Sequence, residues 1–398
     1  MIKIALRNLS RQKRRTLLTV SILSFAILYY IFIAGILSGF ELDSTKNLIE
    51  LETAPIIIRS KNFVQETLNG RIKEPTKIIK KLKQTKFVKN YTERLKTYGF
   101  LDNGIDNYPV IIMGIKWDRD TFVYKMSKYT NTGPGAGILI GEEIAKRFKV
   151  KKGDYLFINF RNQKGALISR EMRINGILST PSFYLNNLYV IMDLDTLNNI
   201  GEFNGEITEI SLLTDNLRKT ATYKSKISNI LSGYKITTWQ EEGKDFLEVS
   251  KTKKSFQFLF LLFIILIGII GTTNTLLIAV FERIREIGTL KAMGMTDGEV
   301  KKMFMLEGLI MGIIGTLVGV ILGVLINLYF VKHGINWSPL LPKDVNLAYR
   351  VSGVVKSSWD IQSIVISLII GPLSTVVASL FPAKKAAKLL PQECLRWI

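Results

Sequence analysis

The sequence predicts an α-helical membrane protein with four transmembrane helices and one large α+β domain, inserted between the first and second helices. Two observations predict this class. The composition is mixed, because 47% hydrophobic residues and a mean hydropathy of +0.21 are too apolar for an ordinary soluble protein, while 22% charged residues are too many for a chain wholly within the membrane. Residues 41–254 contain no apolar run of membrane-spanning length. Four other segments do reach the roughly 20 residues that a spanning helix needs: 17–40, 255–280, 303–331 and 361–381.

Basic residues gather in three short stretches next to the expected spans. Six lie before Thr16, five lie between Arg283 and Lys302, and four lie between Lys384 and Arg396. Short loops rich in Lys and Arg stay in the cytoplasm. We therefore expect both termini inside the cell and residues 41–254 outside the cytoplasm. The net charge of +21 fits this distribution better than a groove for nucleic acid, so we expect no nucleic-acid partner.

The N-terminal segment, residues 1–16, is basic and contains no acidic residue. A signal peptide also begins with a basic region and an apolar one, but its apolar core is shorter and a small-residue cleavage site follows. Here the apolar run continues to residue 40, and residues 35–41 offer no such site. We expect an uncleaved first span that follows a cytoplasmic N-terminal segment.

The large domain reads as two similar pieces around a middle section. In each piece a strand, a helix and a strand follow one another, which predicts a domain of discontinuous halves with an insertion. The halves are residues 41–129 and 201–254, and the β-rich insertion is residues 130–200. The expected strands and helices of the two halves are 54–59, 74–84 and 108–115, then 206–213, 217–231 and 234–239.

The most tightly specified stretch is the polar turn at residues 281–302, between the second and third spans. Its apolar positions recur at helical spacing and predict a short amphipathic helix. Gly294 is placed to end this helix, and Thr296 or Asp297 is placed to cap the next one. Such a helix either docks on a soluble partner or rests on the lipid surface, and physics alone leaves both open. The expected stripe is Ile284, Ile287, Leu290, Lys291 and Met293, and the expected polar face is Glu282, Arg283, Arg285 and Glu286.

The third span carries small residues at nearly regular spacing and one acid. Glycines mostly four apart allow close packing of a helix against its own bundle or against a partner subunit: Gly308, Gly312, Gly315, Gly319 and Gly323. Glu307 is either a link between the polar turn and the bundle or an interfacial acid within reach of water, Lys301 and Lys302. An outer loop at 332–360 precedes the fourth span, and residues 382–398 form a cytoplasmic tail.

The stretch ERIREIGTLKAMGMT resembles the signature of the FtsX/MacB/LolC-LolE permeases, which are ABC-transporter subunits. Residues 41–254 resemble the MacB-like periplasmic core, and PAKKAAKLLP resembles the family's closing motif. The resemblance implies a bacterial inner-membrane protein whose cytoplasmic coupling helix engages an ABC ATPase dimer. It places these residues at the ATPase-coupling positions: Glu282, Arg283, Arg285, Glu286, Gly288, Leu290, Lys291, Ala292 and Gly294.

Within that family the layout resembles the LolC/LolE type, which implies release of lipoproteins to a periplasmic carrier, with a second permease subunit that is a copy or a related chain. One feature departs from it, because the hairpin expected at 157–174 has a short tip at 162–166 where carrier-binding subunits have a longer loop. The alternatives are MacB-like export of peptides or other amphiphiles and FtsX-like signalling to cell-wall hydrolases.

Several chemistries are not expected in this chain. It has no G-x-x-x-x-G-K-[ST] motif, so ATP hydrolysis is expected in a partner subunit rather than here. One cysteine, Cys394, and one histidine, His333, are too few for an ordinary zinc site. We therefore expect no catalytic residues, no metal and no cofactor.

Overall fold

The computed structural model describes residues 2–11, 13–130, 132–336 and 353–396. Part of the outer loop expected at 332–360 lies outside these residues, as do the last two residues of the expected tail. The chain divides into two compact units. Of the described residues, the helical unit contains those up to 42, 250–336 and 354–396, and the sheet domain contains 43–249 and 353.

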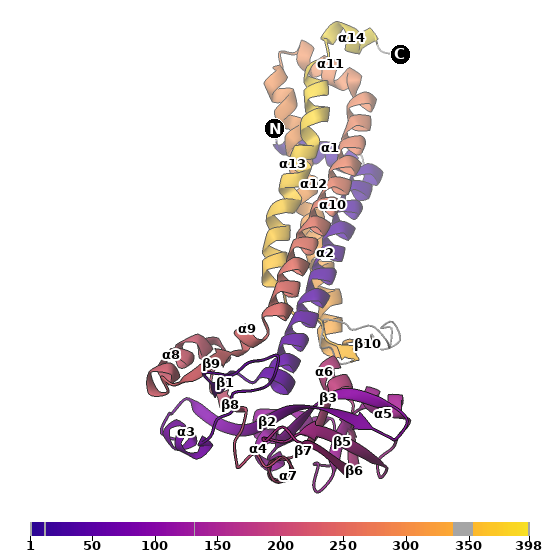
Figure 1. Cartoon of the computed structure of the whole chain (residues 1–398). Coiled ribbons are helices and arrows are strands. Elements are labelled where there is room, and N and C mark those ends of the chain that lie inside the picture. The colour runs from indigo at the N-terminus through magenta and orange to yellow at the C-terminus, as the bar shows by residue number, and fades with distance from the viewer. Residues whose placement is uncertain (1, 12, 131, 337–352, 397–398) are drawn as a thin grey trace. The chain divides into compact units, whose positions relative to one another are not determined.

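Four long helices form the core of the helical unit and run side by side in Figure 1. Among the described residues, these four are long and apolar enough to cross a membrane. They are α2 (Lys13–Asn47), α10 (Lys244–Glu282), α12 (Asp297–His333) and α13 (Ile361–Ala387). Each helix is longer than the apolar run that predicted it, because backbone hydrogen bonding continues into the polar flanks.

Three short helices lie near one end of this bundle, as Figure 1 shows. They are α1 (Ile2–Arg11), α11 (Ile284–Ala292) and α14 (Pro391–Arg396). Two short strands, β10 (Ile335–Asn336) and β11 (Val354–Val355), pair antiparallel.

The sheet domain alternates strands and helices along most of its length. Its strands are β1 (Ile56–Ser60), β2 (Val88–Asp102), β3 (Asn107–Ile115), β4 (Ile138–Gly141), β5 (Tyr155–Arg161), β6 (Leu167–Leu178), β7 (Tyr189–Asp193), β8 (Glu209–Thr214) and β9 (Tyr234–Thr238). Its α-helices are α3 (Pro75–Leu82), α4 (Trp117–Val123), α5 (Glu142–Phe148), α6 (Phe183–Leu188), α7 (Leu194–Ile200), α8 (Thr220–Ile230) and α9 (Trp239–Glu242).

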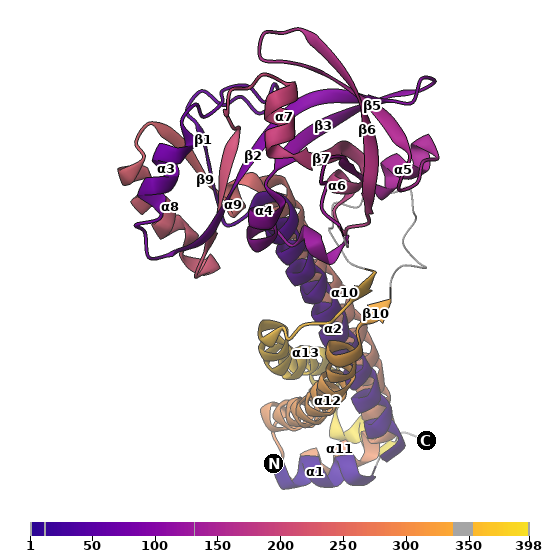
Figure 2. The ribbon, with the colours of Figure 1, turned by 90° about the horizontal axis from the view of Figure 1, so that it is seen from below.

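The strands have the order β3-β7-β4-β6-β5-β2-β8-β1-β9, and β3 also pairs with β2. This extra pairing closes six strands, β2 to β7, into a barrel. The remaining strands, β8, β1 and β9, extend the sheet from the first half of β2 (Figure 2). Helices α3 and α8 lie at the end of the sheet that β1 and β9 form.

The longest strand, β2, joins the two parts of the domain. On one side its residues 88–94 pair with β8 and its residues 99–102 pair with β5. This strand was not expected from the sequence, because three charged residues, Glu93, Arg94 and Lys96, interrupt its apolar pattern although all three are buried. The β-rich section was expected to begin at residue 130, whereas strand pairing brings β2 and β3 into the same barrel as β4 to β7.

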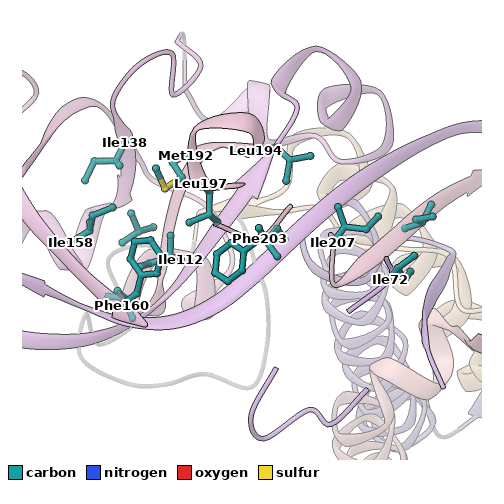
Figure 3. Packing of buried hydrophobic residues seen from close by; sticks show 14 of the residues in the cluster. Ile72, Ile112, Ile138, Ile158, Phe160, Met192, Leu194, Leu197, Phe203 and Ile207 are labelled. Atoms are coloured by element: carbon teal, nitrogen blue, oxygen red, sulfur yellow. The ribbon is translucent and has the colours of Figure 1, made fainter. Parts of the chain in front are cut away.

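One large apolar cluster fills the sheet domain and crosses both parts of it. Figure 3 shows Phe203 beside Phe160, in the cluster that also contains Ile72 and Ile207. The two rings have centroids 6.4 Å apart. Ile72 and Ile207 exchange both backbone hydrogen bonds, of 2.7 and 3.1 Å, which fixes the segment before α3 against the segment before β8.

A group of buried charges lies between strands of this domain. The Glu209 carboxylate on β8 is 0% exposed and accepts hydrogen bonds from Arg59 on β1, while Lys96 on β2 forms a 2.7 Å ion pair with it. Burial alone would raise the pKa of Glu209, but the nearby cations lower it to about 2. A second buried pair, Arg94 and Asp120, joins β2 to α4 at 2.8 Å. Because each charge has a counter-charge, the desolvation cost of this group is offset.

Candidate functional site

The segment between α10 and α12 folds into a helix with defined ends. Residue 283 lies outside helical geometry between α10 and α11, and Gly294 adopts a φ of +99° after α11. The amides of Gly294 and Met295 donate to Lys291 and Leu290 of the last turn, which is how a glycine stop satisfies the final carbonyls. Thr296 then caps α12 in a reciprocal arrangement with Glu299.

One face of α11 packs into the end of the bundle. Ile284, Ile287 and Gly288 are buried. Ile287 belongs to an apolar cluster with residues of α10, α12 and α13. A side chain on Gly288 would collide with Cys394 of α14, so this position needs glycine for the close approach. Met293 was expected in the same apolar stripe, but it follows the last helical residue and is 72% exposed, so that prediction is wrong.

Arg283 was also misplaced by the helical pattern. It was expected on the polar face, but it is only 7% exposed. Its guanidinium donates to Glu307 of α12 at 3.2 Å and to Glu286 of α11 at 2.9 Å. Burial alone would lower the pKa of Arg283, but these two carboxylates outweigh it and raise the pKa above the ordinary arginine value.

Glu307 is 3% exposed and ties three helices together. It accepts a 2.7 Å hydrogen bond from Asn8 of α1 as well as the bonds from Arg283. Of the two interpretations of Glu307, the geometry agrees with the link to the polar turn. Among the described residues, the cation that forms an ion pair with Glu307 is Arg283 and not Lys301 or Lys302.

Lys291 attaches the far end of α11 to α13. Its ammonium donates to the backbone carbonyls of Ala387 and Leu389, at 2.7 Å each, and pairs with Asp297 at 2.8 Å. A cation at the last carbonyls of a helix is favourable because it also complements the helix dipole.

The remaining coupling candidates lie on the outer side of α11 or at its ends. Leu290 is half-buried, Glu286 is more than half exposed, and Gly294 forms the exposed stop. The other three, Glu282, Arg285 and Ala292, are also exposed. The structure therefore separates the nine candidates into a group that fixes α11 in the bundle and a more exposed group, whose charged members are Glu282, Arg285 and Glu286.

The glycine series of α12 faces two neighbours within the same bundle. A Cβ added at Gly308 or Gly312 would meet Ser379 or Thr375 of α13. A Cβ added at Gly315, Gly319 or Gly323 would meet α2 instead, and the hydroxyl of Ser24 on α2 donates to the carbonyl of Gly315 at 2.9 Å. In this structure the series contacts its own bundle.

Sequence reasoning missed the contribution of Asn8, Asp297 and the end of α13. Asn8 lies 299 residues from Glu307 in the chain, and nothing in the basic N-terminal segment distinguishes its amide as a partner. The only available signal was the buried acid itself, which requires some donor.

Comparison with known proteins places this segment in a family context. Residues 258–391 match the family model described as FtsX-like permease C-terminal, and this range contains α11 and the glycine series. The lipoprotein-releasing system transmembrane protein LolC of Xylella fastidiosa is 23% identical over 313 residues, which are 74% of this chain and 74% of that protein. The corresponding protein LolE of Haemophilus influenzae is 22% identical over 395 residues, 94% of this chain and 93% of that protein.

A solved structure also matches part of the chain. The periplasmic region of MacB from Actinobacillus actinomycetemcomitans is 15% identical, with a TM-score of 0.35, and the match covers 50% of this chain and 95% of that one.

Proposed function

We infer the function of this chain from its family, because it is an ABC-transporter permease of the FtsX, MacB and LolC/LolE type. We propose that α11 is the element on which a separate ATPase acts. One observation carries this proposal: the buried Arg283–Glu307 pair joins the start of α11 to α12, a helix long and apolar enough to cross a membrane. A displacement of α11 by the ATPase would therefore move α12 as well.

Both ends of α11 support this mechanical role. Arg283 anchors the start on α12, and Lys291 anchors the end on the last carbonyls of α13. Gly288 keeps the middle in close contact with α14. We propose that the exposed charges, Glu282 and Arg285 among them, form the surface that the ATPase contacts.

We further propose the orientation of the chain. The bundle would span the bacterial inner membrane with α11 and both termini in the cytoplasm and the sheet domain in the periplasm. Helices α2 and α10 lead directly into and out of residues 43–249, so tilting them would move the sheet domain as a lever. Apolar side chains exposed along α10, including Phe256, Phe263 and Ile270, would face lipid or a second permease subunit.

The cargo that we propose is a lipoprotein, released from the membrane for delivery to a periplasmic carrier. Support for this comes from the two relatives, which are named as parts of a lipoprotein-releasing system and cover most of the chain. The second permease subunit would be another copy or a related chain.

The coupling proposal is tested by co-purification of the chain with its ATPase from membranes. Arg285→Glu is expected to abolish recovery of the ATPase, because it reverses an exposed charge on α11. Arg218→Glu, on an exposed residue of the sheet domain, is the matched control and is expected to leave recovery unchanged. Undiminished binding by the Arg285 variant would exclude this face of α11 as the docking surface.

The cargo proposal is tested by depletion of the protein from its host. We expect lipoproteins destined for elsewhere to accumulate in the inner membrane, measured by membrane fractionation. Normal lipoprotein distribution combined with a defect in cell-wall hydrolysis or in peptide export would reject lipoprotein release and favour one of those alternatives.

A further inference from the structure

A pocket of about 670 Å³ lies in the sheet domain where two strands separate along β2. Residues 88–94 of β2 pair with β8, while residues 99–102 pair with β5 on the same side. The strands β5 and β8 therefore diverge between these two pairings. The pocket is lined there by residues of β2, of the β5–β6 hairpin and of the loop at 67–71. Its volume is in the range of pockets that hold a small ligand or a short peptide segment.

Arg71 lines this pocket with an unsatisfied donor. Its Nε atom is buried and has no hydrogen-bond acceptor among the described residues. Burial lowers the pKa of Arg71, and the negative charge of Glu206 offsets part of this effect. A buried donor without an acceptor costs free energy. Because Nε is closed to solvent, an incoming anion would reach Arg71 at the terminal nitrogens of its guanidinium.

The guanidinium of Arg71 is held in place before any ligand arrives. It lies 4.2 Å from the centroid of the Phe203 ring, which is fully buried. The next residue, Ile72, exchanges two backbone hydrogen bonds with Ile207, and the preceding Gly70 adopts a φ of +87°. A planar fork fixed on a ring is suited to bidentate binding of a carboxylate.

The other walls combine aromatic surface with polar groups. Tyr98 and Phe100 of β2 are each 47% exposed and line the pocket. Arg161 brings a second guanidinium, whose Nη1 donates to Gly165 at the hairpin tip. None of the described lining residues is acidic.

The tip of the hairpin forms a firm wall of this pocket. Asn162 accepts hydrogen bonds from the amides of Lys164 and Ala166, which closes the tip. The amide of Gln163 donates to Gly201, and its side chain accepts from Asn204 at 3.1 Å. The short tip is thus attached to the segment between α7 and β8.

We propose that this pocket binds an acidic peptide segment, with a carboxylate on Arg71 and flanking apolar side chains against Tyr98 and Phe100. The two exposed rings argue against a small, fully hydrated anion, because such a ligand would leave their apolar surface unused. The cations and the lack of acidic residues argue against a basic peptide. This assignment rests on the sheet domain alone and does not depend on coupling to an ATPase.

The test uses the purified full-length chain in nanodiscs and three fluorescent blocked hexapeptides. Each contains five leucines and one internal residue, at the third position, which is aspartate, asparagine or phosphoserine. Fluorescence anisotropy is expected to detect binding of the aspartate peptide, with the asparagine peptide binding at least about 10-fold more weakly, since a charged hydrogen bond is lost. Equal binding of these two peptides would overturn the proposal, and tighter binding of the phosphoserine peptide would reassign the pocket to phosphate.

Substitutions locate the binding on the pocket. Arg71→Gln is expected to weaken binding of the aspartate peptide by about 10- to 100-fold, and Arg71→Lys by less, because lysine keeps the charge without the planar fork. Arg147→Gln is the matched control, since Arg147 also stacks on an aromatic ring, Tyr108 at 4.5 Å, but does not line the pocket. Equal losses for Arg71→Gln and Arg147→Gln would overturn the proposal.

A further variant keeps the test decisive if Arg71→Gln impairs folding. Phe100→Ser removes a half-exposed ring. It is expected to preserve the thermal unfolding temperature and to weaken binding of the aspartate peptide several-fold. Unchanged peptide binding by a folded Phe100→Ser variant would remove this pocket as the site.

Discussion

The two carboxylates that Arg283 contacts are expected to differ strongly in their energetic coupling to it. Glu307 is 4% exposed at its side chain, and its Oε1 lies 3.2 Å from the guanidinium. Glu286 lies closer, at 2.9 Å, but its side chain is 56% exposed. Distance alone would make Glu286 the stronger partner of Arg283. Burial makes Glu307 the stronger partner, because water screens the exposed pair with Glu286.

The magnitudes follow from these exposures. A buried hydrogen bond between charged groups contributes about 1.5–3 kcal/mol, and an exposed ion pair contributes about 0.2–1 kcal/mol. We therefore expect the Arg283–Glu307 coupling to exceed the Arg283–Glu286 coupling by at least about 0.5 kcal/mol.

Two double-mutant cycles measure this difference. They combine Arg283→Met with Glu307→Gln and with Glu286→Gln, each of which removes a charge at nearly constant volume. Unfolding of the purified chain in mixed micelles, followed by the loss of helical circular dichroism, gives each free energy. ATPase stimulation by the same variants is expected to fall with loss of the Glu307 pair and to change little with loss of the Glu286 pair. Equal couplings, or a larger one for Glu286, would refute the buried link between α11 and α12.

Three further outcomes are expected from other parts of the structure. Because the pKa of Glu209 is lowered from 4.5 to about 2, its contribution to folding stability is complete above pH 4.5 and is lost as the pH falls toward 2. The loss amounts to at most about 3 kcal/mol. Thermal unfolding between pH 7 and 2.5 should show this loss in the native chain and a flatter pH profile in Glu209→Gln. Gly312→Leu is expected to cost about 1–3 kcal/mol of bundle stability by overpacking against α13, while Gly268→Leu, with open space around it, should cost under about 0.5 kcal/mol, and similar costs would contradict the packing. Lys291→Met is expected to lower the free energy of unfolding by about 1–3 kcal/mol and to lower ATPase stimulation, because two 2.7 Å hydrogen bonds to carbonyls disappear. Stimulation at the wild-type level would show that Lys291 does not anchor α11 for coupling.

The ends of α11 could be predicted from the sequence, because they depend on local rules. A glycine that follows the last turn and a threonine three residues before a glutamate are signals that act within a few residues. The structure has Gly294 at φ +99° and Thr296 as the cap of α12, as expected. Local hydrogen bonds decide such features whatever the rest of the chain does.

Arg283 and Met293 show where that kind of reasoning fails. Helical periodicity assigns faces only to residues inside a helix, and these two residues flank α11, which contains Ile284–Ala292. The side chain of a flanking residue points in a direction set by its own backbone angles, which for Arg283 are φ −111° and ψ 20°. A turn of this angle carries the guanidinium into the bundle, where Glu307 is buried.

The failure to predict strand β2 has a different cause. The same cause explains why the proposed peptide pocket could not be found from the sequence. Glu93, Arg94 and Lys96 read as surface residues, but in the fold Arg94 meets Asp120 and Lys96 meets Glu209. Such partners become visible only when distant strands are paired, because pairing converts a polar pattern into a buried one. The divergence of β5 from β8 along β2 is likewise set by strand register. No pattern in the sequence therefore indicates the pocket that Arg71 lines between these strands.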